Sequence, residues 1–465
     1  MKSSRTCCSS LATWQKTTSD VAVPEAYNLL FFIALYRYIR INTPFMTAKQ
    51  IPLLFFLLCC SIMVRASSIL IYMDEDQKNH LKAYGITYWS IKQQADVSWL
   101  LNYRGGSFLI KYNKAVEDEC KARGVSYQIL PDGKVTAILN EISNPQVNME
   151  MVKLEKAPKI AVYSPKSKLP WDDAVTLVLT YAEIPYDVVY DDEVLKDKLT
   201  GYDWLHLHHE DFTGQYGRFW SAFRNATWYR EDVKNQEAAA KRNGFKKVSE
   251  MKLAVAKRIK EFCAGGGFLF AMCSGTDSFD IALSAEGVDI CESMFDGDAA
   301  DPQAQSKLNF NQTFAFKDFQ LDLNPANYEF SDIDVTQTRT LTQSNDYFTL
   351  FDFSAKWDLV PTMLTQNHDK VIKGFMGQTT AFRKRLVKPG VTVLGENKGA
   401  EEVRYLNGEI GKGQFTFYGG HDPEDYQHAV GDPPTDLNLH PNSPGYRLIL
   451  NNVLFPAAKK KPQKT

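Results

Sequence analysis

The sequence lacks an excess of charge of either sign. Its 53 Lys and Arg residues nearly balance 55 Asp and Glu residues, and the formal net charge at pH 7 is −2. Proteins that bind nucleic acid electrostatically carry a basic face, so this balance gives no basis for a nucleic-acid partner. The only basic run lies in the tail, residues 458–465, which we interpret as a solvated terminus.

The sequence also lacks the usual motifs of a metal site. No CxxC or HExxH pattern is present, and the cysteines after residue 66 match neither a zinc spacing nor a dense disulfide framework. We therefore predict no metal and no cofactor. In an oxidising compartment one pair of these cysteines could form a disulfide. They are Cys120, Cys263, Cys273 and Cys291.

The N-terminal segment has the features of a targeting signal. Met46 is a possible true start, an apolar run covers residues 51–63, and residues 64–66 fit a small-residue cleavage site. The run is too short to span a bilayer comfortably. We predict that residues 1–66 are an over-extended start plus a signal peptide (46–66), and that the mature protein is secreted or periplasmic with no stable membrane span. A lipoprotein anchor and an uncleaved anchor are the alternatives.

Residues 67–156 form a first predicted unit, a small α/β domain of unknown role. It is expected to end in a polar stretch near residues 144–155. The predicted strands are 68–73, 107–112 and 125–130, and the predicted helices are 76–84 and 114–123.

Residues 157–457 form a second predicted unit in which strands and helices alternate. Such alternation indicates an α/β fold with a doubly wound, mostly parallel sheet, whose ligands bind at the carboxyl ends of the strands. An aromatic-rich insertion of strands and loops is expected at about 300–385. The predicted strands are 159–163, 186–190, 204–207, 268–272, 391–394 and 414–418, and the predicted helices are 172–182, 252–263, 278–283 and 446–454.

Cys273 follows a predicted buried strand and precedes a predicted helix. A tight turn at such a junction exposes its central side chain and aims backbone N–H groups and the helix dipole at the same point. A cysteine there gains thiolate character beside an oxyanion site, with N–H groups near Ser274 and Gly275 as its donors. The alternative interpretation is a buried, inert cysteine.

His421 lies at the end of another predicted strand, after two glycines and beside acidic residues. A histidine in that position can act as a general base whose tautomer a carboxylate fixes, and Asp422 and Glu424 are the nearest candidates. The alternative is a loop histidine that makes local hydrogen bonds.

Two further groups of polar residues are candidates for contact with a substrate. The first follows the strand 204–207, where alternation places His206 and His208 on one face and His209 on the other. These side chains could bind a metal, contact a polar substrate or make local hydrogen bonds. The second is Arg104, which could bind a carboxylate or phosphate, although a plain turn is the alternative. The substrate-binding candidates are Ser274, Gly275, Asp277, His208, His209, Glu210, Asp211 and Arg104.

Together, the Cys273 turn and the late strand ending in histidine resemble the class I glutamine amidotransferase-like superfamily. Residues 411–424, followed by residues 446–454, are also similar to the C-terminal part of ThuA-like proteins, which share that flavodoxin-like fold. The resemblance implies Cys273 as nucleophile, His421 as base and Glu424 as orienting acid. The chain departs from the family's His-Pro-Glu pattern because Asp422 is inserted, and the family's glycine-rich oxyanion loop is absent.

Residues 274–278 also resemble the pyrophosphate-binding loop of ATP pyrophosphatases, which include asparagine synthetase. Proteins that look like this one are often labelled asparagine synthetase B, so a glutamine-hydrolysing asparagine synthetase is a further alternative that the resemblance implies. A glutamine-hydrolysing enzyme of that kind needs an N-terminal cysteine, and neither Met1 nor Met46 is followed by one.

The sequence thus favours an exported Cys–His hydrolase that acts on an amide or related C–N bond of a small-molecule substrate. No ammonia-accepting synthase domain is evident, so we expect a stand-alone hydrolase. A non-catalytic ThuA-like ligand-binding protein is the alternative from another functional class. The substrate, the oligomeric state and the role of residues 67–156 are not assigned by the sequence.

Overall fold

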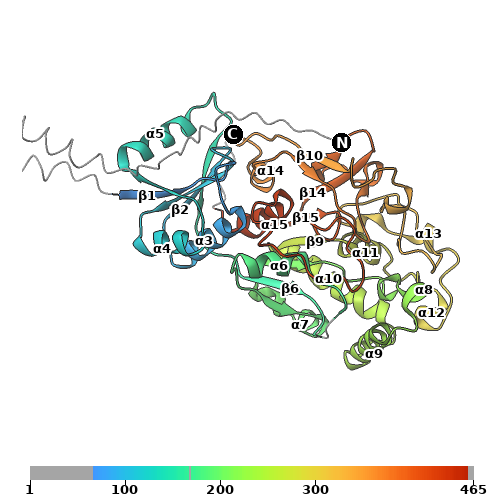
Figure 1. Cartoon of the computed structure of the whole chain (residues 1–465). Coiled ribbons are helices and arrows are strands. Elements are labelled where there is room, and N and C mark those ends of the chain that lie inside the picture. Colours follow the sequence, from blue (N-terminus) through green and yellow to red (C-terminus); the bar gives the residue numbers. More distant parts are fainter. Residues whose placement is uncertain (1–65, 167–168, 459–465) are drawn as a thin grey trace, which may run out of the picture. The chain divides into compact units, whose positions relative to one another are not determined.

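The computed structural model describes residues 66–166 and 169–458 (Figure 1). These residues belong to one compact unit that begins at Ala66. The predicted signal peptide and over-extended start lie outside the described residues, as does the basic tail from residue 459.

The first part of the described chain forms a five-stranded sheet in the order β4-β1-β3-β2-β5, with every pair antiparallel. The polar stretch predicted at 144–155 is wrong in part, because β5 occupies five of its residues and pairs with β2. The strands are β1 Ala66–Ile71, β2 Val97–Leu101, β3 Ser107–Lys111, β4 Gln128–Pro131 and β5 Glu150–Leu154, and the helices are α3 His80–Lys92, α4 Lys114–Ala122 and α5 Asp132–Ser143.

The second sheet of the described residues has ten strands and is mixed. Five neighbouring strands, in the order β15-β9-β8-β6-β7, are parallel, and the other half is antiparallel. The protein is therefore α/β as expected, but the expectation of a mostly parallel sheet is wrong. The strands are β6 Ile160–Tyr163, β7 Asp187–Val189, β8 Trp204–Leu207, β9 Phe268–Met272, β10 Tyr347–Leu350, β11 Val371–Lys373, β12 Phe382–Arg383, β13 Thr392–Asn397, β14 Glu402–Ile410 and β15 Gly413–Tyr418.

Side-chain alternation along the central strands separates two hydrophobic cores. On β9, Phe270 and Met272 join one core, whereas Leu269 and Ala271 join the other. Burial on both faces explains why this strand is an uninterrupted apolar run. The helices of this part are α6 Ala174–Tyr181, α7 Asp191–Leu195, α8 Trp220–Phe223, α9 Thr227–Arg242, α10 Val248–Gly265, α11 Ser274–Ser284, α12 Ser293–Asp296, α13 Ala304–Lys307, α14 Leu359–Leu364 and α15 Pro444–Leu454.

Helix α15 lies in the core that the two sheets share. It contacts α3 of the first sheet and α6 of the second, and residues of both segments belong to one hydrophobic cluster. Arg447 on this helix is fully buried and donates hydrogen bonds to the Met73 carbonyl and to the Tyr84 hydroxyl. The first sheet is thus joined to the second by polar bonds as well as by apolar packing.

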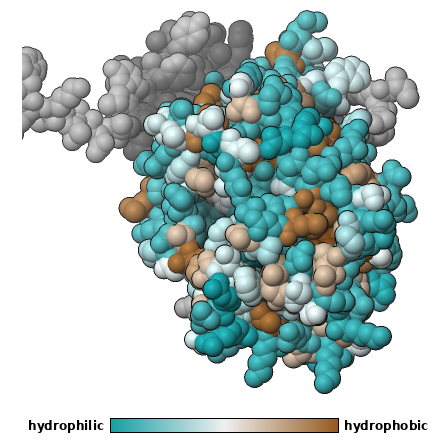
Figure 2. Space-filling model, turned by 90° about the vertical axis from the view of Figure 1, so that its right-hand side faces the viewer, coloured by the Kyte–Doolittle hydropathy of each residue, from teal (hydrophilic) through white to brown (hydrophobic). Residues whose placement is uncertain are grey.

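The surface seen in Figure 2 is mostly hydrophilic, with small groups of hydrophobic side chains. Among the described residues the most exposed large hydrophobic side chains are Leu439 and Trp357, which belong to separate segments. No helix in this part of the chain is long and apolar enough to cross a membrane. The four cysteines named above are all free and buried, so none of them forms the disulfide that the sequence allowed.

Candidate active site

Cys273 occupies a strained turn between β9 and α11. Its backbone has φ 49° and ψ −142°, and the helix begins at the next residue. A non-glycine residue in such a region costs roughly 1–3 kcal/mol and persists only where the surrounding structure holds it. Strain at a strand–turn–helix junction is the arrangement that presents a nucleophile above a sheet.

Backbone hydrogen bonds fix Cys273 against the end of β15. The Cys273 N–H donates to the Gly420 carbonyl at 3.2 Å. His421, which follows Gly420 in the chain, donates its N–H to the Met376 carbonyl at 2.9 Å. Gly377 must be glycine, because a Cβ there would lie 2.7 Å from the His421 nitrogen. The segment 376–380 therefore joins the two predicted catalytic residues in one site, a role that no sequence motif predicts.

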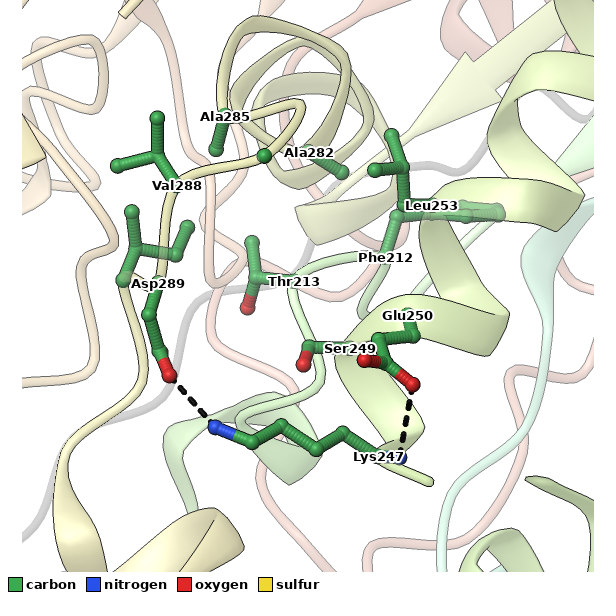
Figure 3. Close-up of a pocket in the computed structure, with 12 residues that line it drawn as sticks. Phe212, Thr213, Lys247, Ser249, Glu250, Leu253, Ala282, Ala285, Val288 and Asp289 are labelled. Carbon is green, nitrogen blue, oxygen red and sulfur yellow. Dashed lines mark hydrogen bonds and ion pairs between the residues drawn. The ribbon is translucent and has the colours of Figure 1, made fainter. Parts of the chain in front are cut away.

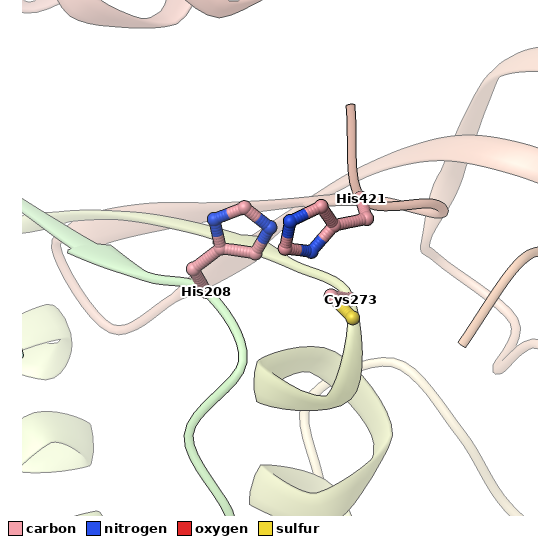
Figure 4. A group of neighbouring side chains, drawn as sticks. All are labelled: His208, Cys273 and His421. Carbon is pink, nitrogen blue, oxygen red and sulfur yellow. The ribbon is translucent and has the colours of Figure 1, made fainter. Parts of the chain in front are cut away.

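Three potential ligand or catalytic side chains converge at this point (Figure 4). The rings of His208 and His421 have centroids 4.4 Å apart, and each imidazole offers a nitrogen within 4.8 Å of the Cys273 sulfur. The sequence thus correctly placed these three residues at one edge of the sheet. It did not predict the contact between the two rings, because they come from strands separated by β9.

The protonation of the Cys273 thiol differs from expectation. Burial raises its pKa to about 11, and this outweighs the nearby backbone groups of Gln378, Ser274 and Thr379, which act in the opposite direction. The predicted gain of thiolate character is therefore wrong for the resting protein. Burial and the neighbouring imidazoles also hold the pKa of His421 well below its usual range. The resting pair is a neutral thiol and a neutral imidazole.

His428 stacks on His421 and carries the opposite protonation. The two rings lie 4.8 Å apart and nearly parallel. The Asp172 carboxylate, 2.8 Å from His428 Nε2, and the Asp425 carboxylate, 2.9 Å from Nδ1, raise the pKa of His428 to about 9. His428 is thus an imidazolium clamped between two carboxylates, and its charge helps to keep His421 neutral.

A cavity of about 530 Å³ opens beside Cys273 and His421. Its lining includes four aromatic side chains and contains no lysine or arginine. His209 also lines this cavity and has its ring 4.8 Å from His208, so the expectation that it points away from His208 is wrong. β8 ends at Leu207, and strict alternation ends with it. The aromatic lining residues are Trp171, Phe219, Phe223 and Tyr328.

The backbone donors near Cys273 differ from those predicted. The Gly275 N–H is bound to the His208 carbonyl at 2.6 Å and is not free to hold an oxyanion or a phosphate. The donors that remain are the N–H groups of Ser274, Gln378 and Thr379, which surround the sulfur. Asp277 supports this segment, since its carboxylate accepts a hydrogen bond from the Thr379 hydroxyl at 2.8 Å. Asp277 is therefore a supporting residue and not a substrate contact.

The acids expected to orient His421 have other partners. Glu424 lies 3.1 Å from His440, and the Asp422 carboxylate accepts the Glu424 N–H at 2.9 Å. Asp173, for which the sequence predicted no role, is the acid beside the histidines. Its Oδ2 lies 3.2 Å from His206 Nε2 and 3.3 Å from His208 Nδ1.

Three further predicted contacts lie outside the cavity. Asp211 accepts hydrogen bonds from the N–H groups of Thr213, Gln215 and Gly217, which makes it a structural cap. Arg104 is bound to Asp74 and Asp76 near the first sheet. Glu210 accepts a hydrogen bond from the Tyr190 hydroxyl at 3.1 Å. These side chains have partners within the fold and do not line the cavity, so the prediction that they contact a substrate there is wrong.

We expect Glu210→Gln to change how stability depends on pH. Burial raises the pKa of Glu210 to about 8, so the folded state holds a proton that the unfolded state releases near pH 4.5. Wild-type stability therefore falls as the pH rises from about 4.5 to 8, whereas the neutral amide avoids this loss. The variant should gain on the order of a few kcal/mol relative to wild type between pH 5 and pH 8.5, measured by urea unfolding. A difference in the free energy of unfolding that stays constant across this pH range would contradict the raised pKa of Glu210.

A second cavity, of about 280 Å³, lies between α10 and α11 (Figure 3). Its only lysine, Lys247, is ion-paired with Asp289, Asp296 and Asp298. No cysteine or histidine lines it, so its Thr213 and Ser249 hydroxyls have no base beside them and the chemistry points to the first cavity.

Comparisons with known proteins give no assignment. No protein-family model and no curated protein matches the chain. A cytoplasmic protein from Salmonella typhimurium aligns with 65% of this chain and 100% of its own length, at 10% identity and a TM-score of 0.32. A second, from Salmonella typhimurium LT2, covers the same shares at 14% identity and a TM-score of 0.31. A beta-galactosidase from Bacillus circulans sp. alkalophilus aligns with 59% of this chain and 29% of its own, at 11% identity and a TM-score of 0.25. Likenesses this weak assign neither fold nor function.

Proposed function

We propose that the protein is a Cys–His hydrolase acting on an amide or related C–N bond. The observation that carries the proposal is the strained backbone of Cys273, at φ 49°, beside two buried imidazoles and an open cavity. Strain of this kind is retained where it serves a site, and an inert core cysteine does not require it.

The arrangement of the parallel strands supports the finer family proposal. Numbered along the chain, β7-β6-β8-β9-β15 has the order 2-1-3-4-5, which is that of flavodoxin-like sheets. Cys273 follows the fourth of these strands and His421 the fifth, as the resemblance to class I glutamine amidotransferase-like proteins implies. We therefore propose a flavodoxin-like core with an antiparallel extension. We also propose, from the N-terminal sequence, that the protein is exported.

In the proposed mechanism, the Cys273 sulfur attacks the carbonyl carbon while its proton passes to His421. The C–S bond forms as the carbonyl π electrons move to oxygen, which the N–H groups of Gln378 and Thr379 hold. Collapse of this intermediate breaks the C–N bond, and His421 gives its proton to the leaving amine. Water then cleaves the thioester by the same route and restores the thiol. His208, held by Asp173, positions the His421 ring.

The lining of the cavity favours an amide that carries an apolar or aromatic group. Glutamine presents an α-carboxylate, which needs a cationic partner when it is taken out of water. The cavity has four aromatic side chains and no lysine or arginine, and the imidazolium in its lining, His428, is already paired with Asp172 and Asp425. The same lining also favours the second candidate function, a non-catalytic protein that binds an apolar ligand. Cysteine-dependent turnover separates the two.

The proposal is tested by the rate at which iodoacetamide alkylates Cys273 in chelator-treated protein. Because the pKa of Cys273 is about 11, only about one thiol in ten thousand is ionised at pH 7. Without a base, the rate should therefore be low at pH 7 and should rise about tenfold per pH unit up to pH 10, which is the profile we expect for His421→Ala. If His421 is the base, His421→Ala should lower the rate at pH 8 by at least about tenfold. Peptide mass spectrometry assigns the label to Cys273.

His440→Ala is the matched control for this experiment. His440 is paired with Glu424 and does not line the cavity, so its loss should leave the alkylation rate within about twofold of wild type. An alkylation rate that does not change in His421→Ala would contradict the Cys–His mechanism and leave ligand binding as the better proposal.

A further inference from the structure

Buried nitrogen atoms without partners surround the Cys273 sulfur. The Nε2 atoms of His208 and His421 have no hydrogen-bond partner, although the two side chains are only 1% and 7% exposed. Leaving a buried polar atom unpaired costs about 1–3 kcal/mol, so two such atoms in one cluster indicate a missing ligand. One nitrogen of each histidine and the sulfur all lie within 4.8 Å of one another.

We infer that His208, Cys273 and His421 bind a thiophilic divalent cation, with Zn²⁺ as the best match. Two imidazole nitrogens and one thiolate are ligands that zinc prefers. Tetrahedral zinc with bonds of about 2.0–2.3 Å places its ligand atoms roughly 3.3–3.8 Å apart, so small side-chain rotations would close the cluster. The Cys273 thiol loses its proton to solvent as the S–Zn bond forms.

The residues around this cluster resemble the outer shell of a zinc site. Histidines that bind zinc commonly have their second ring nitrogen held by a carboxylate. His208 Nδ1 lies 3.3 Å from Asp173 Oδ2, as an ion pair and not as an aligned hydrogen bond, and Nε2 is directed away from that carboxylate. The Asp173 carboxylate is itself fixed, because its Oδ1 accepts the Thr176 N–H at 2.8 Å.

Three of the four other groups of acidic residues, cysteine and histidine that lie close together in the described chain already contain or surround a cation. Both ring nitrogens of His428 lie against carboxylates, so it has no nitrogen left for a metal. The group of Asp289, Cys291 and Asp296 surrounds the ammonium of Lys247, which already supplies the positive charge. The Cys273 cluster has no cation among its three side chains, and the nearest one, the His428 imidazolium stacked on His421, is already paired with Asp172 and Asp425.

The cavity leaves a fourth coordination position open. Cys273 and His421 both line it, so a water molecule or a ligand can reach a bound ion from that side. Three protein ligands and one open position are typical of zinc sites that bind or activate a small molecule. A bound ion would also block the Cys273 thiol as a nucleophile. This inference does not depend on the proposed hydrolase activity.

The test is titration of the metal-free full-length chain, without a histidine tag, with Co²⁺. We expect one ion per chain and a thiolate-to-cobalt charge-transfer band that Zn²⁺ removes by displacement. Cys273→Ser should abolish the band, and Asp173→Asn should weaken Co²⁺ binding by about 10–100-fold. Cys291→Ser is the matched control and should keep the band. Circular dichroism of each variant checks that it is folded.

The outcomes separate this inference from the proposed function. A band that persists in Cys273→Ser, or no Zn²⁺ binding tighter than about 0.1 mM, overturns the metal site whatever the activity. Zn²⁺ should also protect Cys273 from iodoacetamide, and full alkylation of the zinc-loaded protein would count against it. If hydrolysis depends on Cys273 and appears only after a chelator has removed the metal, both proposals are supported. If hydrolysis requires Zn²⁺, the metal site is supported and the thiol nucleophile is overturned.

Discussion

Replacing Cys273 by alanine is expected to lower kcat/KM for an acyl anilide by on the order of 10³-fold or more. The substitution removes the atom that forms the covalent intermediate, while the cavity and the backbone donors around Gln378 stay in place. Those groups alone can leave a small residual rate, as oxyanion holes do in other hydrolases. The measurement is release of aniline by purified full-length protein in the presence of a chelator, after a screen of aryl amides has identified a substrate.

Cys263→Ala provides the matched control for this loss. Cys263 is also a fully buried free cysteine, but it lies in α10 and is absent from the cavity lining. We expect its kcat/KM to stay within about twofold of wild type at a temperature where both proteins are folded. Hydrolysis that survives in Cys273→Ala at the wild-type rate would show that the strained turn has another purpose.

The central strands could be predicted from sequence because their physical signal is local. β8 and β9 are buried on both faces, so β9 is a short apolar run and β8 is apolar apart from His206, and both were predicted with their observed bounds. The antiparallel half could not be predicted in the same way. β14 is nine residues long but includes Arg404, Asn407 and Glu409, and its pairing with β13 and β15 is a long-range choice.

The candidate site was predictable where it depends on strand ends and not where it depends on loops. Cys273 and His421 both follow strands of one parallel set, so their proximity follows from topology. Asp173 was missed because it also caps α6, and a capping aspartate at a helix start needs no further explanation. The donors at Gln378 and Thr379 come from an insertion that no motif in the sequence connects with Cys273.

Replacing Asp280 by alanine is expected to lower the free energy of unfolding by about 3 kcal/mol or more. Asp280 lies on α11, is fully buried, and accepts the N–H groups of Phe314, Ala315 and Phe316 at 2.6, 2.7 and 2.9 Å. Alanine would leave three buried donors without partners. Burial raises the pKa of Asp280 to about 6, which offsets part of the gain from these bonds and keeps the expected loss below the sum of three charged hydrogen bonds.

Ser284→Ala is the matched control, because Ser284 is equally buried on α11 but donates only to the Ile281 carbonyl of its own helix. Urea unfolding of both variants measures the difference, and losses within about 1 kcal/mol of each other would refute the anchoring role of Asp280. The same comparison bears on the site. α11 begins directly after Cys273, so the bonds that anchor α11 to the insertion also help to maintain the strained turn. Cys273 should therefore be alkylated faster in Asp280→Ala than in Ser284→Ala, because a loosened turn exposes the thiol to water and lowers its pKa.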